Sequence, residues 1–274
     1  MPVEQEAHTL FRRFVLTNKK EETALAVWKE KYPALTTDVG ALLRESLGDG
    51  ARLTMADLPT VKVPAGGATS WQLPTGESAE VLEGVLVVYQ PVRAFWEESF
   101  EEGGGGSPPD CSSDDTVIGK GMFGVDSETN PTGQCDKCPM SEFGSGKNNA
   151  QACRLVTRLF LLQEGSLVPT LVLLPPSSYK EARAYVRDIA VIWQTLPTRM
   201  LTKIELVKDK SGGGRDSKGG ITYSKAFFAK PEPLPADVAM YMLAYRQQME
   251  KLLKATAISE GAEPLDVEHE RVEV

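Results

Sequence analysis

Residues 155–174 read LVTRLFLLQEGSLVPTLVLL, which is the richest apolar stretch of the chain. Within it, two apolar runs at 155–163 and 168–174 flank the turn formers Glu164-Gly165-Ser166. Short apolar runs bounded by a turn signal predict β-strands, and two in succession predict a hairpin. The polar turn also excludes a membrane-spanning helix from this stretch, because such a helix needs about 20 consecutive apolar residues.

The sequence after this hairpin predicts a helix, a second hairpin and a long helix. Pro175-Pro176-Ser177-Ser178 ends the first hairpin and caps a helix over 179–196. Strands at 200–208 and 221–228 then flank a glycine-rich loop, and another helix covers about 235–257. The residues expected on the buried face of the first helix are Ala182, Tyr185, Val186, Ile189 and Ile192 or Trp193.

The sequence before the hairpin predicts helices first and strands later. Residues 4–31 and 37–47 place apolar side chains at near-helical spacing, and Gly48-Asp49-Gly50 ends the second helix. Three strands are expected to follow, at 61–63, 70–73 and 81–92.

These elements predict an α+β protein built on a mostly antiparallel barrel or curved sheet of the oligonucleotide-binding (OB) type. An OB barrel has five strands, and the helix at 179–196 would fill the place of the helix that often joins its third and fourth strands. The expected parts are an N-terminal helical segment (1–55), an OB-like core (56–230) with a zinc insertion (101–153), a C-terminal helix (231–258) and a disordered acidic tail (259–274).

The insertion contains all four cysteines of the chain, Cys111, Cys135, Cys138 and Cys153. Two of them form a Cys-x2-Cys knuckle, and the two single cysteines complete a four-sulfur shell that suits zinc. The surrounding sequence is rich in Gly, Ser, Asp and Pro and has few apolar residues to bury, but a bound metal can order such a segment. We therefore predict one structural zinc ion per chain, with no open position for catalysis.

Three other uses of the cysteines stay open. Two disulfides would suit a small secreted domain, although the chain has no apolar N-terminal signal segment. A redox Cys-x-x-Cys pair usually lies where a strand runs into a helix, whereas residues 135–139 lie among turn formers. An iron–sulfur cluster would use the same four thiolates.

Charge is distributed unevenly along the chain. The whole chain carries a formal charge of −8, but residues 143–230 carry 14 Lys and Arg against 6 Asp and Glu. A single-stranded nucleic acid is bound by cations that follow its phosphates and by aromatic rings on which its bases stack. The residues expected to form such a surface are Phe143, Lys147, Arg154, Arg158, Lys203, Lys208, Lys210, Arg215, Lys218 and Tyr223.

Several of these motifs resemble a family of mostly uncharacterised proteins from tailed phages and prophages. The similarity covers about 120 of the 274 residues, and its motifs are PPDCSSDD at 108–115, the knuckle Cys135-x2-Cys138-Pro139, Phe143-Gly144-Ser145, Ala152-Cys153, RLFLL at 158–162 and LPPS at 174–177. Members resemble zinc-containing single-stranded DNA-binding proteins of the OB type. The resemblance implies a role in phage or mobile-element DNA replication or recombination, with the cysteines as metal ligands. The lack of a targeting segment predicts a cytoplasmic location, here in a bacterial host cell.

The leading interpretation is a non-enzymatic single-stranded DNA-binding protein whose acidic tail recruits replication or recombination proteins. Only His8 and His269 are present, both near the ends, so a histidine base has little to support it. One alternative is a zinc-stabilised adaptor between proteins, in which the terminal helical regions form a homo-oligomer. The other is a metal-dependent nuclease, which would bind a hard cation through Asp110, Asp114, Asp115 and Asp126.

Overall fold

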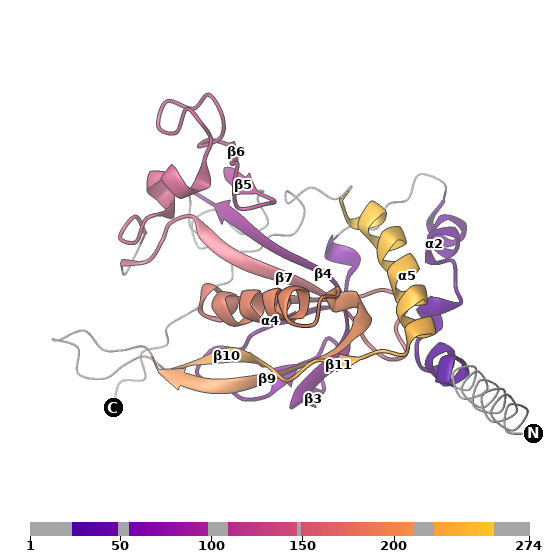
Figure 1. The fold of residues 1–274 in the computed structure, drawn as a ribbon. Coiled ribbons are helices and arrows are strands. Elements are labelled where there is room, and N and C mark those ends of the chain that lie inside the picture. Colours follow the sequence, from indigo (N-terminus) through magenta and orange to yellow (C-terminus); the bar gives the residue numbers. More distant parts are fainter. Residues whose placement is uncertain (1–23, 49–54, 98–108, 147–148, 211–221, 255–274) are drawn as a thin grey trace, which may run out of the picture.

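The fold is a mixed α+β arrangement in which one antiparallel-dominated sheet curls into a half-barrel (Figure 1). The computed structural model describes residues 24–48, 55–97, 109–146, 149–210 and 222–254. The strands of the main sheet are β1 (Thr60–Lys62), β4 (Val81–Phe95), β5 (Cys111–Ser113), β6 (Lys120–Gly121), β7 (Arg154–Leu162), β8 (Thr170–Leu174), β9 (Met200–Lys210), β10 (Thr222–Phe228) and β11 (Glu232–Pro233).

A small second sheet and several helices complete the fold. The second sheet pairs β2 (Trp71–Gln72) with β3 (Ser78–Ala79). The α-helices are α2 (Val39–Leu47), α4 (Tyr179–Val191) and α5 (Ala236–Lys254), and residues 24–31 are also helical. Short 3-10 helices are η1 (Pro33–Leu35), η2 (Met55–Asp57), η3 (Cys135–Lys137), η4 (Pro139–Ser141), η6 (Pro176–Ser178) and η7 (Pro197–Arg199).

Strand β4 organises the sheet because it pairs along both of its edges. Residues 85–94 pair with β7, while on the other edge residues 81–85 pair with β9 and 93–95 pair with β5. Gly84 lies where the strand passes from β9 to β7, and a Cβ atom there would collide with the carbonyl oxygen of Leu162. A glycine at this point allows the close backbone approach that the curl of the sheet requires.

The inner, concave face of the sheet encloses one apolar cluster. Trp71 is fully buried in it and donates its indole N–H to the carbonyl of Ile204 at 3.1 Å. Ala182 of α4 packs into the same cluster. Ser178, which directly precedes α4, links this region to β10, because its Oγ accepts the backbone N–H of Ala226 at 3.0 Å.

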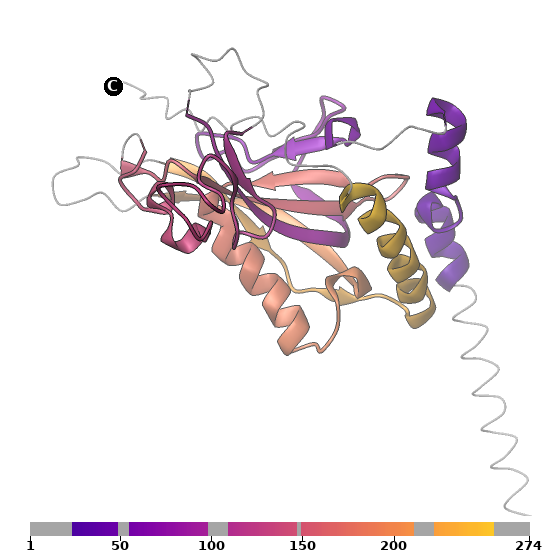
Figure 2. The ribbon, with the colours of Figure 1, turned by 90° about the horizontal axis from the view of Figure 1, so that it is seen from above.

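The outer face of the sheet is covered by α5 and the N-terminal helices, which lie at one end of the molecule (Figure 2). Phe160 and Leu162 of β7 pack there with Val238 and Met242 of α5. Since Leu159 and Leu161 face the inner cluster, β7 is buried on both faces. This double burial explains why residues 159–162 form an unbroken apolar run instead of an alternating one.

The structure confirms both predicted hairpins and corrects one helix. Strands β7 and β8 pair as expected, as do β9 and β10, and Thr202, Ile204 and Leu206 face inward. Helix α4 ends at Val191, however, so the prediction that Ile192 or Trp193 lies in the core is wrong; they are 70% and 38% exposed.

The two chain ends are described only in part. Helix α5 ends at Lys254, close to the predicted end, and the predicted acidic tail lies outside the described residues, as do residues 1–23. Within the part of the chain that the structure describes, no helix is long and apolar enough to cross a membrane.

Candidate metal centre and nucleic-acid interface

The four cysteines lie in an insertion between β4 and β7, which we call the cysteine module (described residues 109–146 and 149–153; Figure 1). Strands β4 and β7 remain paired as far as Ala94 and Arg154, so the chain enters and leaves the insertion at neighbouring positions. Cys111 lies in β5, Cys135 begins η3, Cys138 precedes η4 and Cys153 directly precedes β7. Four different local structures therefore supply the four sulfurs.

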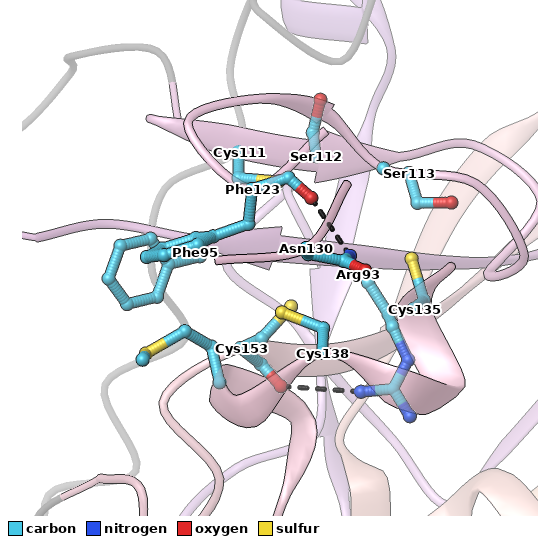
Figure 3. Close-up of a pocket in the computed structure, with 12 residues that line it drawn as sticks. Arg93, Phe95, Cys111, Ser112, Ser113, Phe123, Asn130, Cys135, Cys138 and Cys153 are labelled. Atoms are coloured by element: carbon cyan, nitrogen blue, oxygen red, sulfur yellow. Dashed lines mark hydrogen bonds between the residues drawn. The ribbon is translucent and has the colours of Figure 1, made fainter. Parts of the chain in front are cut away.

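All four cysteines line one small pocket (Figure 3), and each is only 5–7% exposed. They are free thiols, with no disulfide between them. The other residues that line the pocket are Arg93, Phe95, Ser112, Ser113, Gly119, Phe123, Asn130 and Met140. The fold therefore brings together cysteines that are up to 42 positions apart in the sequence, between Cys111 and Cys153.

The chemistry of this donor set fits zinc, but its geometry does not yet form a coordination shell. Four sulfurs and no carboxylate line the pocket among the described residues, which is the ligand set of a structural zinc site. Within the same described ranges, however, no group of three or more Cys, His, Asp or Glu side chains is placed to hold a metal ion. Zinc binding would require the thiol side chains to turn toward a common point.

Hydrogen bonds hold the loops of the module around the pocket. Asn130 is 4% exposed, and its Nδ2 donates to the carbonyls of Phe123 at 3.0 Å and Gln134 at 3.2 Å. The backbone N–H of Cys153 donates to the carbonyl of Met140 at 2.7 Å, which ties the knuckle to the start of β7. These contacts join the loops on both sides of the pocket.

Burial raises the pKa of the thiols of Cys111, Cys135 and Cys153, the last to about 11. At Cys135, the hydroxyl of Ser113 and the charge of Arg93 lower the pKa and so oppose this rise. The Arg93 charge acts in the same direction on Cys153. A bound metal deprotonates a coordinating thiol outright, so occupation of the site would convert neutral thiols into thiolates.

Two groups of the residues expected to contact nucleic acid are exposed. Phe143 of the cysteine module is 79% exposed, although it is a large apolar side chain. Arg154 is exposed at the start of β7, and Lys208 and Lys210 are exposed near the end of β9. Tyr223 lies beside them on β10, half-buried, and its hydroxyl donates to Asp209 Oδ2 at 3.1 Å.

Two of the expected residues are placed elsewhere. Arg158 is only 5% exposed within the sheet, so its guanidinium is not presented to a ligand and we leave it out of the interface. Its burial lowers its pKa, and the charge of Asp114 opposes that effect. Lys203 forms ion pairs with Glu83 at 3.4 Å and Glu232 at 2.9 Å in the middle of the sheet. Lys147, Arg215 and Lys218 lie outside the described residues.

Three of the four aspartates that a nuclease would use have local roles. Asp110 Oδ2 accepts the backbone N–H of Glu97 at 2.7 Å, and Asp114 pairs with Lys120 at 3.1 Å. Asp115 Oδ1 accepts the backbone N–H of Val117 at 2.8 Å. These contacts are those of loop-shaping side chains, so the structure adds no support to the nuclease hypothesis.

Sequence reasoning missed Arg93 and Asn130, which shape the pocket. Arg93 lies near the end of β4 between the buried residues Val92 and Ala94, and a charged residue between apolar neighbours is a signal that could have been used. Asn130 carries no such signal, because its loop is polar throughout. Only the folded arrangement shows that its amide joins two chain segments.

Comparisons with known proteins return no match: no family model, no curated protein and no solved structure corresponds to this chain. Its function must therefore be argued from the half-barrel, the cysteine module and the exposed residues themselves.

Proposed function

We propose that the protein binds single-stranded DNA at the end of the half-barrel that carries both the cysteine module and the β9–β10 hairpin. The observation that carries this proposal is that these two segments project from the same end of the molecule, opposite α5 and α2 (Figures 1 and 2). OB barrels bind oligonucleotides between the loop that joins their first two strands and the loop that joins their last two.

The order of strands supports an OB-type assignment. Strands β4, β7, β8, β9 and β10 would be the five barrel strands, because β4 pairs with both β7 and β9 and because α4 lies between β8 and β9. In this assignment the cysteine module occupies the first of the two binding loops, and β9 and β10 flank the second. Strand β1, which pairs in parallel with β8, would be an addition to the barrel.

The exposed side chains at this end have the chemistry that single strands require. Phe143 offers an exposed ring for stacking, and Lys208 and Lys210 offer exposed charges for phosphates. The proposed role in phage or mobile-element DNA replication or recombination rests on the family resemblance of the cysteine block. Zinc bound by Cys111, Cys135, Cys138 and Cys153 would fix the module that presents Phe143.

The binding proposal is tested by fluorescence anisotropy with a labelled oligo-dT strand and a duplex of equal length over a range of salt. We expect salt-sensitive binding that favours the single strand, with a log–log slope of about −0.7 per phosphate contacted. Phe143→Ala should weaken binding by about 5- to 150-fold, which corresponds to about 1–3 kcal/mol for one stacked base. The double variant K208Q/K210Q should make the salt slope shallower by about 1.4.

The matched control is K29Q/K31Q, which removes two charges from the helix at the opposite end and should leave binding unchanged. Tight duplex binding without single-strand affinity would overturn the proposal. Failure to bind any nucleic acid at low salt would favour the adaptor hypothesis instead.

Zinc is tested separately. Metal analysis of the purified protein should find about one zinc per chain, and Cys138→Ser should release it. Removal of the metal with a chelator should increase amide hydrogen exchange in the cysteine module more than in the half-barrel. A protein that contains no zinc, or a Cys138→Ser variant with full metal content, would contradict this assignment.

A further inference from the structure

We propose that Arg93 is the cationic partner of the four-cysteine centre and stabilises its metal-bound form by offsetting the negative charge of the thiolates. The inference rests on the proposed zinc site and names a residue outside the cysteine module as a determinant of metal affinity. Cys-x2-Cys spacing gives no hint of this residue, because Arg93 precedes the first cysteine by 18 positions and belongs to the half-barrel.

The position of Arg93 is fixed by the sheet. It pairs with Ser113 of β5 on one edge of β4 and with Leu155 of β7 on the other, so its backbone is held from both sides. From there its side chain lines the cysteine pocket, and Nη1 donates to the carbonyl of Cys153 at 3.5 Å (Figure 3). Of these contacts, the pairing with Leu155 of β7 belongs to the half-barrel, whereas those with Ser113 and Cys153 direct the arginine to the module.

The charge balance of the pocket requires such a group. Four thiolates around one divalent ion carry a net charge of about −2, and a buried net charge is unfavourable unless a counter-charge lies nearby. The rest of the lining is neutral, and three of its side chains, Phe95, Phe123 and Met140, are large and apolar. Among the described residues that line the pocket, Arg93 is the one cation.

Other cations of the module are less suited to this role because they are solvated. Lys137 lies within the knuckle but is exposed, and Lys120 is exposed and paired with Asp114. Water and salt screen such charges, whereas a half-buried charge is screened much less. Lys137 is therefore a suitable control. Lys137→Gln removes the same formal charge as Arg93→Gln, and Lys137 lies between two of the proposed ligands, Cys135 and Cys138, in the sequence.

The test measures zinc affinity by competition with a chelator, in the full-length protein, for the wild type, Arg93→Gln, Arg93→Lys and Lys137→Gln. Arg93→Gln should bind zinc about 10- to 100-fold more weakly, which is the usual effect of removing an outer-shell partner. Arg93→Lys should recover most of the affinity, and Lys137→Gln should match the wild type. The loss in Arg93→Gln should persist at high salt.

Cobalt substitution provides a readout that does not depend on affinity. The thiolate-to-cobalt absorption of Arg93→Gln should keep the wild-type shape once the protein is saturated, which shows that the four sulfurs still coordinate and that the module folds. Wild-type affinity in Arg93→Gln would overturn the inference while leaving the zinc site intact. If Arg93→Gln does not fold, Arg93→Lys decides: near wild-type affinity supports a charge effect, and a large loss overturns it. A wild-type protein that binds no zinc would remove the zinc site and this inference together.

Discussion

At the scale of single residues, Asn130 shows how a polar loop becomes ordered. Its side chain is buried, and one amide nitrogen donates to two backbone carbonyls, those of Phe123 and Gln134. A buried carbonyl that loses its donor keeps the cost of desolvation without the benefit of the bond. The asparagine therefore connects the segment that follows Cys111 to the segment that precedes Cys135.

Asn130→Asp should destabilise the cysteine module by about 1–3 kcal/mol, because a carboxylate cannot donate to the two carbonyls. The measurement is hydrogen exchange of the module's amides together with chemical denaturation. Thr129→Ala, at the exposed neighbouring position, is the control and should have little effect. Equal stability of Asn130→Asp and the wild type would show that the two hydrogen bonds are not important.

At the scale of elements, the bend of β4 at Gly84 determines the shape of the sheet. Gly84→Ala should lower the free energy of unfolding by about 1–3 kcal/mol, because the new Cβ would collide with the Leu162 carbonyl. Gly40→Ala, in the first turn of α2, is the matched control. Its new Cβ would lie 3.4 Å from the nearest atom, Asp38 Oδ1, which is an ordinary van der Waals distance. Alanine favours a helix over glycine, so Gly40→Ala should be neutral or stabilising by up to about 1 kcal/mol. Equal effects of the two substitutions in urea denaturation would contradict this account.

The sequence predicts the elements of this fold better than their relative positions. The hairpins and α5 follow from short-range patterns, and the cysteine spacing indicates that distant sulfurs converge. Burial of Arg158 could not be predicted, because an arginine within a run of apolar residues indicates a half-exposed strand until the layer that covers it is known. The end of α4 was also missed, since Ile192 continues the apolar spacing although Gln194 takes a left-handed conformation (φ 50°).

At the scale of the whole molecule, buried tyrosines make stability depend on high pH. Burial, with smaller effects of Glu83 and Glu164, raises the pKa of Tyr32 to about 12. Burial also raises the pKa of Tyr89 to about 12. An unfolded tyrosine ionises near pH 10, so in this range the unfolded chain loses protons first. The stability that these groups contribute is complete below about pH 10 and is lost as the pH rises toward 12.

Denaturation midpoints measured from pH 9 to 12 should therefore fall, and Tyr32→Phe should make the fall shallower. The phenylalanine keeps the ring that stacks on Trp28, with the two ring centroids 5.0 Å apart. The comparison therefore isolates the ionisable hydroxyl. An unchanged slope in Tyr32→Phe would show that Tyr32 does not contribute to the alkaline transition.

The pairing of Ala94 with Arg154 has a consequence for how the protein can change over evolution. The insertion leaves β4 and returns to β7 at paired positions. It therefore takes the place of the turn in a β4–β7 hairpin. The entropic free-energy cost of closing such a loop grows only slowly, by about 0.6 kcal/mol for each doubling of its length. The cysteine module is thus a cassette that a lineage could lengthen, exchange or delete while the register of β4 and β7 stays the same.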